Sequence, residues 1–185
     1  MKVADLMTSE VRACSTHDSL NAAARIMWDH DCGCAPVVDT HGKLIGIVTD
    51  RDVCMAAYTQ GKPLQSIPVE RAMSAKVISC GRADDLESAH RLMRTYEIHR
   101  LPVVDSRGRL AGILSLSDLL KHAIGNGAEP VDGIEVLTTL CAIRRRRERH
   151  LAHAGLNGNA PAAIEPKKAP RKRAARPRKP AADAG

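Results

Sequence analysis

The chain has 185 residues, which is enough for one domain of ordinary size or two small ones whose core needs no disulfides. Aromatic residues make up 2% of the chain and phenylalanine is absent, so the core must consist of valine, isoleucine, leucine, methionine and alanine. The first residues form no apolar run of signal-peptide length, and no stretch approaches the roughly 20 apolar residues that span a bilayer. We therefore expect a cytoplasmic protein without membrane contact.

The formal net charge of +7 is unevenly distributed along the chain. Residues 1–143 contain 15 basic and 18 acidic side chains, which gives −3. Residues 144–185 contain 13 basic and 3 acidic side chains, which gives +10. The basic excess therefore belongs entirely to the C-terminal part of the chain.

An internal repeat organises the first two thirds of the sequence. A shift of 66 residues aligns positions 7–52 with 73–118 without a gap, and 17 of the 46 aligned pairs are identical. Chance does not produce such a match, so the same structural unit is expected twice. The identical pairs include Met7 and Met73, Cys14 and Cys80, Gly46 and Gly112, Asp52 and Asp118, and the run PVVD at 36–39 and 102–105.

Each repeat shows the same order of predicted elements. A short strand leads to an amphipathic helix, which we expect Asp18 or Asp84 to cap. Two strands follow, joined by a tight turn in which Gly42 or Gly108 supplies the positive φ, and a second helix closes the unit. The elements are predicted at 11–14, 19–30, 35–39, 44–49 and 50–60, and again at 77–80, 85–96, 101–105, 110–115 and 116–123.

A β-α-β-β-α unit of about 50 residues is too small to bury its own sheet face. Two copies that pack sheet against sheet would solve this problem, so we predict an α/β (α+β) module with an approximate internal two-fold axis. A third helix is expected at 131–154, with Ile134, Leu137, Leu140 and Cys141 on its apolar side. The predicted divisions are repeat 1 at 1–60, a linker at 61–68, repeat 2 at 69–124, the basic helix at 131–154 and a disordered Ala/Pro/Lys/Arg-rich tail at 155–185.

The six cysteines are spread through apolar segments, so we expect reduced and mostly buried thiols. Cys32 and Cys34 form a C-x-C pair that raises a metal or redox alternative. The pair lacks a second cysteine pair or a histidine at metal-ligand spacing, so we predict no metal site. A thiol-based stress sensor stays open as a third, less favoured function.

The duplicated motif of PVVD, a turn glycine and then G-apolar-apolar-[T/S]-x-x-D resembles the CBS domain pair, or Bateman module, over residues 1–124. The resemblance implies two clefts between the repeats that bind AMP, ADP, ATP or S-adenosylmethionine, and a homodimer formed through helices into a flat disc. In that family the aspartate of the motif holds the ribose, and the hydroxyl lies near the ribose or the phosphate. This places ligand contacts at Thr49 and Asp52 in repeat 1, and at Ser115 and Asp118 in repeat 2.

The stretch HRLPVVD is also similar to the last repeat of the regulatory gamma subunit of the AMP-activated protein kinase, in which the matching basic residues face phosphate. The resemblance therefore implies phosphate contacts from His99 and Arg100. Arg51 is a weaker candidate, and its counterpart in the second repeat is Ser117. Because repeat 1 has Gly33 and Cys34 where repeat 2 has this basic pair, the two clefts cannot be equivalent.

Elementary chemistry supports two interpretations of the [T/S]-x-x-D motif. The two oxygens of a carboxylate can accept from both hydroxyls of a ribose diol, and a hydroxyl at a helix N-terminus suits a phosphate. The same spacing also fits a capping box that only satisfies backbone donors. The two roles can coexist.

No pairing of a nucleophile with a base stands out, so we predict a regulatory module and not an enzyme. The alternative is a nucleic-acid-associated protein in which the repeats join two basic arms. The basic tail could bind DNA, RNA or another polyanion by releasing counterions. It has no aromatic residues for base stacking, so such binding would ignore sequence.

Overall fold

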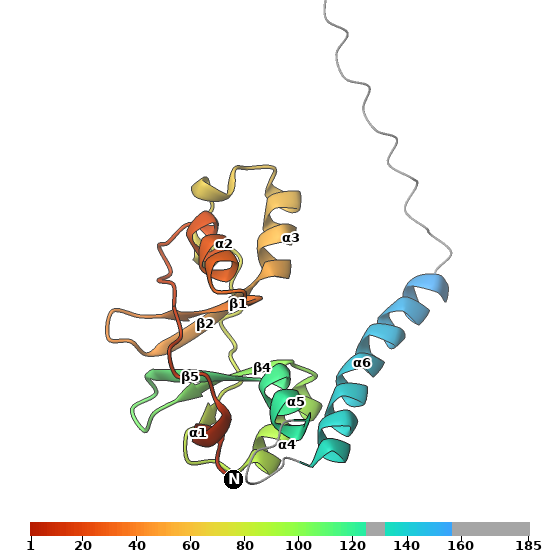
Figure 1. Ribbon diagram of the computed structural model, residues 1–185. Helices are drawn as coiled ribbons and strands as arrows, with labels where there is room; N and C mark the ends of the chain where they lie inside the picture. The colour runs from red at the N-terminus through yellow and green to blue at the C-terminus, as the bar shows by residue number, and fades with distance from the viewer. Residues whose placement is uncertain (125–131, 157–185) are drawn as a thin grey trace, which may run out of the picture. The chain divides into compact units, whose positions relative to one another are not determined.

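The computed structural model describes residues 1–124 and 132–156, with side chains described as far as Arg144 (Figure 1). Residues Met1–Arg149 form one compact unit, to which the following paragraphs refer. The tail predicted at 155–185 lies, from residue 157 onward, outside the described residues. Among the described helices, none combines the length and the apolar character that a membrane crossing requires.

The predicted helices and hairpins are confirmed in both repeats, and so is the α/β fold. The first repeat contains α2 (Leu20–Asp29), β1 (Cys34–Val38), β2 (Leu44–Thr49) and α3 (Asp50–Gln60). The second contains β3 (Cys80–Gly81), α4 (Leu86–Tyr96), β4 (Arg100–Val104), β5 (Leu110–Ser115) and α5 (Leu116–Ile124). The short helix α1 (Val3–Leu6) and the 3₁₀ turns η1 (Leu64–Ser66) and η2 (Val69–Arg71) precede the repeats, and α6 (Gly133–Leu156) follows them.

Each repeat is built around an antiparallel hairpin, β1 with β2 and β4 with β5. Gly42 and Gly108 both adopt φ +76° in the turns, as predicted. The strand predicted at 11–14 is only a single bridge from Cys14 to Val37, and the strand predicted at 77–80 begins at its last residue, as the two-residue β3. Each predicted strand therefore joins the sheet only at its last residue, Cys14 or Cys80.

The predicted helix caps are one residue too early. The N-caps of α2 and α4 are Ser19 and Asp85, each of which accepts from the backbone N–H three residues further on, at 3.3 and 2.7 Å. Asp18 and Asp84 accept instead from the backbone N–H three residues before them, at 2.7 and 2.8 Å. Each repeat has two adjacent residues that could cap the helix. The second one caps it, and the acid at the first position hydrogen-bonds to the backbone of the preceding turn.

The segment that precedes each repeat packs on the other repeat. The backbone N–H of Val3 in α1 donates to the carbonyl of Asp84 at 2.9 Å, and Val69 in η2 donates to Asp18 at 2.8 Å. These two bonds are 66 residues apart, so they are counterparts under the internal two-fold. The divisions predicted at 1–60, 61–68 and 69–124 stay predictions, and this packing crosses them.

Backbone pairs between the two hairpin strands and the opposite entry segments join the repeats. Thr8 exchanges two hydrogen bonds of 2.9 Å with Ile113 in β5, and Ser74 exchanges bonds of 2.9 and 3.1 Å with Ile47 in β2. The hairpin turns also meet, because Lys43 and Arg109 form an antiparallel bridge. The repeats are therefore held together by main-chain bonds that do not depend on side-chain identity.

The buried side chains form two clusters, one in each repeat. The first repeat's cluster includes Leu20, Ala23, Val37, Val48, Ile67 and Val69. The second repeat's cluster includes Val3, Leu6, Met93, Leu101, Leu114 and Leu119. Each cluster thus includes side chains from the entry segment of the other repeat, Ile67 and Val69 in the first and Val3 and Leu6 in the second, while the predicted sheet-on-sheet packing stays a prediction.

Helix α6 confirms the predicted third helix, but of its predicted apolar side only Leu140 packs against the core, where it is partly buried. Val136, Thr139 and Ile143 are buried against the second repeat, whereas Ile134 and Leu137 are 76% and 56% exposed. Cys141 is exposed as well. The apolar residues of α6 therefore lie on two stripes, and the structure uses the one at 136, 139 and 143 for its own core.

A buried polar contact attaches α6 to α4. The Thr139 hydroxyl donates to the Glu135 carbonyl at 2.9 Å, so it accepts from Nδ1–H of His90, also at 2.9 Å. Arg94 pairs with Glu135 at 3.3 Å beside it. Nε2 of His90 is buried and has no hydrogen-bond partner in the described part of the chain.

Gly46 and Gly112 occupy equivalent positions in the two repeats, but we predict that alanine at these positions lowers the stability of the fold by different amounts. A Cβ at Gly112 would lie 2.7 Å from the backbone oxygen of Thr8, whereas a Cβ at Gly46 would first meet the flexible Met73 side chain, at 2.6 Å from Sδ. We expect Gly112→Ala to lower the free energy of unfolding by about 1–3 kcal/mol and Gly46→Ala by less than about 1 kcal/mol. Urea denaturation followed by circular dichroism measures both, and equal losses would contradict the prediction.

Because His90 is buried, we predict that the free energy of unfolding falls at acidic pH. Burial lowers the pKa of His90 below its usual 6.5, the carboxylates of Glu135 and Asp132 oppose this shift, and Arg94 adds to it. The unfolded chain therefore binds more protons, and the stabilisation that is complete above about pH 6.5 is lost as the pH falls toward the lower folded value.

We expect the urea midpoint of the wild type to fall between pH 7.5 and 5.5, and His90→Gln to fall less over the same range. A variant with the wild-type pH dependence would show that another group controls it.

Candidate functional site: a cleft between the repeats

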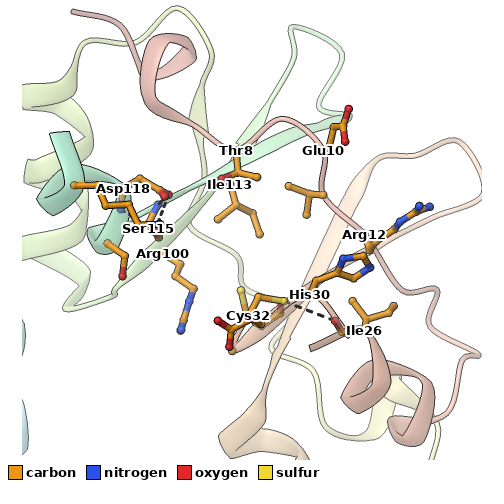
Figure 2. A pocket seen from close by; sticks show the side chains of 16 residues that line it. Thr8, Glu10, Arg12, Ile26, His30, Cys32, Arg100, Ile113, Ser115 and Asp118 are labelled. Atoms are coloured by element: carbon orange, nitrogen blue, oxygen red, sulfur yellow. Dashed lines mark hydrogen bonds between the residues drawn. The ribbon is translucent and has the colours of Figure 1, made fainter. Parts of the chain in front are cut away.

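A cavity of about 540 Å³ lies between the two repeats, within the compact unit (Figure 2). One wall comes from β5 and α5 of the second repeat. The other comes from the end of α2 and the start of β1 in the first repeat, and the entry segment runs between them. The residues that line it are Thr8, Glu10, Val11, Arg12, Ile26, His30, Asp31, Cys32, Gly33, Cys34, Arg100, Ile113, Ser115, Ser117, Asp118 and Lys121.

Ser115 and Asp118, two of the predicted site residues, lie together on the second-repeat wall. Asp118 Oδ2 accepts from the backbone N–H of Ser115 at 2.9 Å and from its hydroxyl at 2.6 Å, while the Asp118 N–H donates to the Ser115 hydroxyl at 3.2 Å. These bonds use one carboxylate oxygen and fix the side chain at the start of α5. Oδ1 makes no hydrogen bond with the described residues, so it is free to accept from a ligand.

Arg100 also lines the cavity, as the sequence predicted for a phosphate contact. It begins β4 directly opposite Ser115 in the β4–β5 register, which brings the guanidinium to the same wall. Its Nη2 reaches the first repeat, where a Cβ at Gly33 would lie only 2.8 Å away. The absent side chain of Gly33 therefore makes the space that Arg100 occupies.

The other predicted residues lie elsewhere. Thr49 and Asp52 form a capping box on α3, with bonds of 2.9, 2.7 and 3.2 Å that match those of Ser115 and Asp118, and they do not line this cavity. Arg51 is exposed and also lies outside it. The structure thus forms the capping interaction at both motifs, and ligand contact stays a prediction at each.

His99 does not line the cavity either, although Arg100 beside it does. Its side chain is exposed, yet partial desolvation lowers its pKa, and the neighbouring Arg100 charge lowers it further. His99 is therefore more often neutral near pH 7 than a free histidine. A neutral imidazole can donate one hydrogen bond to a phosphate but gives it no charge.

Sequence reasoning missed the wall that the first repeat supplies. Glu10 and Arg12 come from the irregular entry segment, and His30 and Asp31 come from the end of α2. Lys121 comes from α5, one turn beyond Asp118. The alignment of the repeats could not find them, because a cleft between two copies is lined by different positions from each.

The cavity has mixed charge. Arg12, Arg100 and Lys121 are basic, whereas Glu10, Asp31 and Asp118 are acidic. The acids can accept hydrogen bonds from sugar hydroxyls or amines, and the cations can pair with an anionic group. Such a lining suits a polar ligand that carries both kinds of group.

The prediction of mostly buried thiols is wrong for half of the cysteines. Cys14, Cys34 and Cys80 are buried, and burial raises the pKa of each thiol to about 11. Cys32, Cys54 and Cys141 are exposed. Cys32 was expected in the core with Cys34, but it precedes β1 and its side chain reaches the cavity instead. Among the described residues, no group of three potential ligands is arranged to hold a metal ion.

Comparison with known proteins agrees with this architecture. The CBS domain matches residues 3–58 and 69–125. A CBS domain-containing protein of Bacillus subtilis, YhcV, is 38% identical over 124 residues, which cover 67% of this chain and 86% of that protein. An inosine-5'-monophosphate dehydrogenase of Methanocaldococcus jannaschii is 33% identical over 122 residues, but these cover only 23% of that enzyme.

Solved structures show the same fold. The CBS domain pair of protein MJ0100, in complex with 5'-methylthioadenosine and S-adenosyl-L-methionine, is 29% identical with a TM-score of 0.60, and the match covers 65% of this chain and 94% of that one. CBSX2 in complex with AMP is 27% identical with a TM-score of 0.59, covering 66% and 96%. With its two tandem repeats, the chain belongs to the CBS domain family.

Proposed function

We propose that this protein is a non-enzymatic, cytoplasmic regulatory module that binds an adenosine-containing ligand in the cleft beside Ser115 and Asp118. The observation that carries the proposal is the cavity between the repeats, whose wall brings the Asp118 carboxylate and the Arg100 guanidinium together. Related CBS domain pairs bind 5'-methylthioadenosine, S-adenosyl-L-methionine or AMP, which supports an adenosine ligand here.

In this proposal, Asp118 accepts from the ribose hydroxyls and Ser115 lies near the ribose or the phosphate. Arg100 pairs with phosphate, whereas His99 stays a weaker phosphate candidate because it does not line the cavity. Thr49, Asp52 and Arg51 are the equivalent candidates for the second cleft. The cleft of repeat 2 is the better candidate, because Arg100 has Cys34 as its counterpart in repeat 1.

The signal is proposed to arise from differential affinity. A ligand that contacts both walls prefers one arrangement of the two repeats, and it shifts the population toward that arrangement. AMP, ATP and S-adenosylmethionine are the ligands to test. A homodimer is part of the proposal, since it would present two such modules to one effector.

The two matching capping boxes provide a test with an internal control. Asp52→Ala and Asp118→Ala remove the same backbone hydrogen bonds, so each is expected to lower stability by a similar amount, about 1 kcal/mol. Only Asp118 lines the cavity, so we expect Asp118→Ala to weaken ligand binding in this cavity at least about tenfold, while Asp52→Ala leaves binding in this cavity little changed and affects only a ligand bound in the second cleft.

Isothermal titration of AMP, ATP and S-adenosylmethionine against the wild type and both variants measures this difference. Unchanged binding in Asp118→Ala would refute the site assignment. An absence of binding of all three ligands to the wild type would refute the proposed function.

The charge distribution favours one second function, an association with nucleic acid. Residues 157–185 contain eight basic and two acidic side chains, which gives +6, and they follow the arginine-rich end of α6. We expect the full chain to bind duplex DNA without sequence preference and with an affinity that falls steeply as salt rises. Removal of residues 157–185 should reduce the salt slope and leave nucleotide binding intact. Fluorescence anisotropy at several salt concentrations tests this, and identical slopes would contradict it.

A further inference from the structure

The helical face of the first repeat is apolar and exposed. Trp28 on α2 is 87% exposed, and Tyr58 and Met55 on α3 are 74% and 47% exposed. Between these two helices lies a groove of about 340 Å³, which we call the α2/α3 groove. It is lined by Ala24, Met27, Trp28, Asp31, Cys32, Asp50 and Val53.

The equivalent surface of the second repeat indicates what kind of element the groove can bind. In the second repeat, the counterparts of Ala24 and Trp28 are His90 and Arg94. These two residues contact α6, since His90 bonds to Thr139 and Arg94 pairs with Glu135. The α2/α3 groove therefore corresponds to a surface that, in the other repeat, is covered by a helix (Figure 1).

The groove does not match the side of α6 that is buried on its own repeat. Where the second repeat offers polar His90 and Arg94 to Thr139 and Glu135, the first repeat offers a methyl group and an indole ring. An occupant of the groove should therefore present apolar side chains and positive charge, since Asp31 and Asp50 line the groove and no basic residue does.

The exposed side of α6 has these properties. Ile134, Leu137, Cys141 and Arg144 follow one another at helical spacing, and all four are exposed. We call them the outer stripe of α6. The stripe is apolar at its start and basic at its end, where the sequence continues with Arg145, Arg146 and Arg147.

We propose that the α2/α3 groove binds the outer stripe of α6 from a second copy of this chain. Leu137 packs against Met27 and Val53, and Arg144 stacks on Trp28 and pairs with Asp31 or Asp50. The inner side of that helix stays on its own second repeat. Within one chain, α6 is held at the second repeat through Val136 and Ile143, so the groove is left for the other copy.

A two-fold axis makes this contact twice, because the α6 of each copy meets the groove of the other. The dimer therefore differs from direct pairing of the helical faces, because α6 lies between the first repeat of one copy and the second repeat of the other. The groove shares Asp31 and Cys32 with the ligand cavity, but the proposed contact forms without nucleotide, and the experiments below separate the two.

Two exposed cysteines allow a direct test. Cys32 lines the groove and Cys141 belongs to the outer stripe, whereas Cys14, Cys34 and Cys80 are buried; the third exposed cysteine, Cys54 on α3, is replaced by serine for this experiment. The full chain, mixed from ¹⁴N- and ¹⁵N-labelled protein, is treated with a short bis-maleimide and analysed by mass spectrometry. We expect peptides that link Cys32 to Cys141 in mixed heavy and light form. Links between these cysteines within single chains only would overturn the proposal.

Substitutions test the same contact by sedimentation over a range of protein concentrations. Leu137→Glu and Trp28→Glu each place a charge in the proposed contact, and we expect each to raise the dimer dissociation constant at least about tenfold. His41→Glu, in the exposed β1–β2 turn, adds a charge elsewhere and should change it little. Nucleotide binding and circular dichroism of each variant should stay those of the wild type, which separates lost dimerisation from lost folding.

A wild type that is monomeric at all concentrations would refute the proposal, as would a dimer that neither Leu137→Glu nor Trp28→Glu weakens.

Discussion

The exchange of entry segments between the repeats is the constraint on which the remaining structure depends. Thr8 pairs with Ile113 and Ser74 pairs with Ile47, so each hairpin gains a backbone partner from the other half. Thr8 and Ile113 also line the cavity. The bonds that join the repeats therefore form part of the cleft wall, and any ligand that fills the cleft acts directly on the contact between the two halves.

The two halves are copies in backbone but not in chemistry. Both [T/S]-x-x-D motifs form the same capping bonds, within 0.1 Å of each other. The difference arises where β1 and β4 begin, with Gly33 and Cys34 in one half and His99 and Arg100 in the other. Arg100 reaches across to Gly33, so these two adjacent differences act together: one adds a cation to the cleft and the other leaves the space for it.

Local patterns predicted the local elements well, because hydrophobic period and turn glycines act over a few residues. The hairpins around Gly42 and Gly108 and the closing helices α3 and α5 lie where they were expected. Features that depend on long-range packing were missed. The caps moved from Asp18 and Asp84 because either of two adjacent polar residues could serve, and only the preceding turn decides between them. The contribution of Glu10 and Arg12 to the cavity could not be predicted, because it depends on how the entry segment packs against the other repeat.

Helix α6 shows why a pattern with two apolar stripes leaves the buried side undecided. The sequence pattern placed Ile134 and Leu137 on the buried side, whereas Val136 and Ile143 are buried. The side that packs is the one whose Thr139 and Glu135 meet His90 and Arg94, and only the fold brings these residues together. The same contact links the helix to the site. Asp118 and Lys121 lie in α5, whose Leu119 shares a core cluster with Val136. A ligand that repositions α5 therefore changes the surface on which α6 rests, and this gives the proposed module a physical route from its cleft to its outer face.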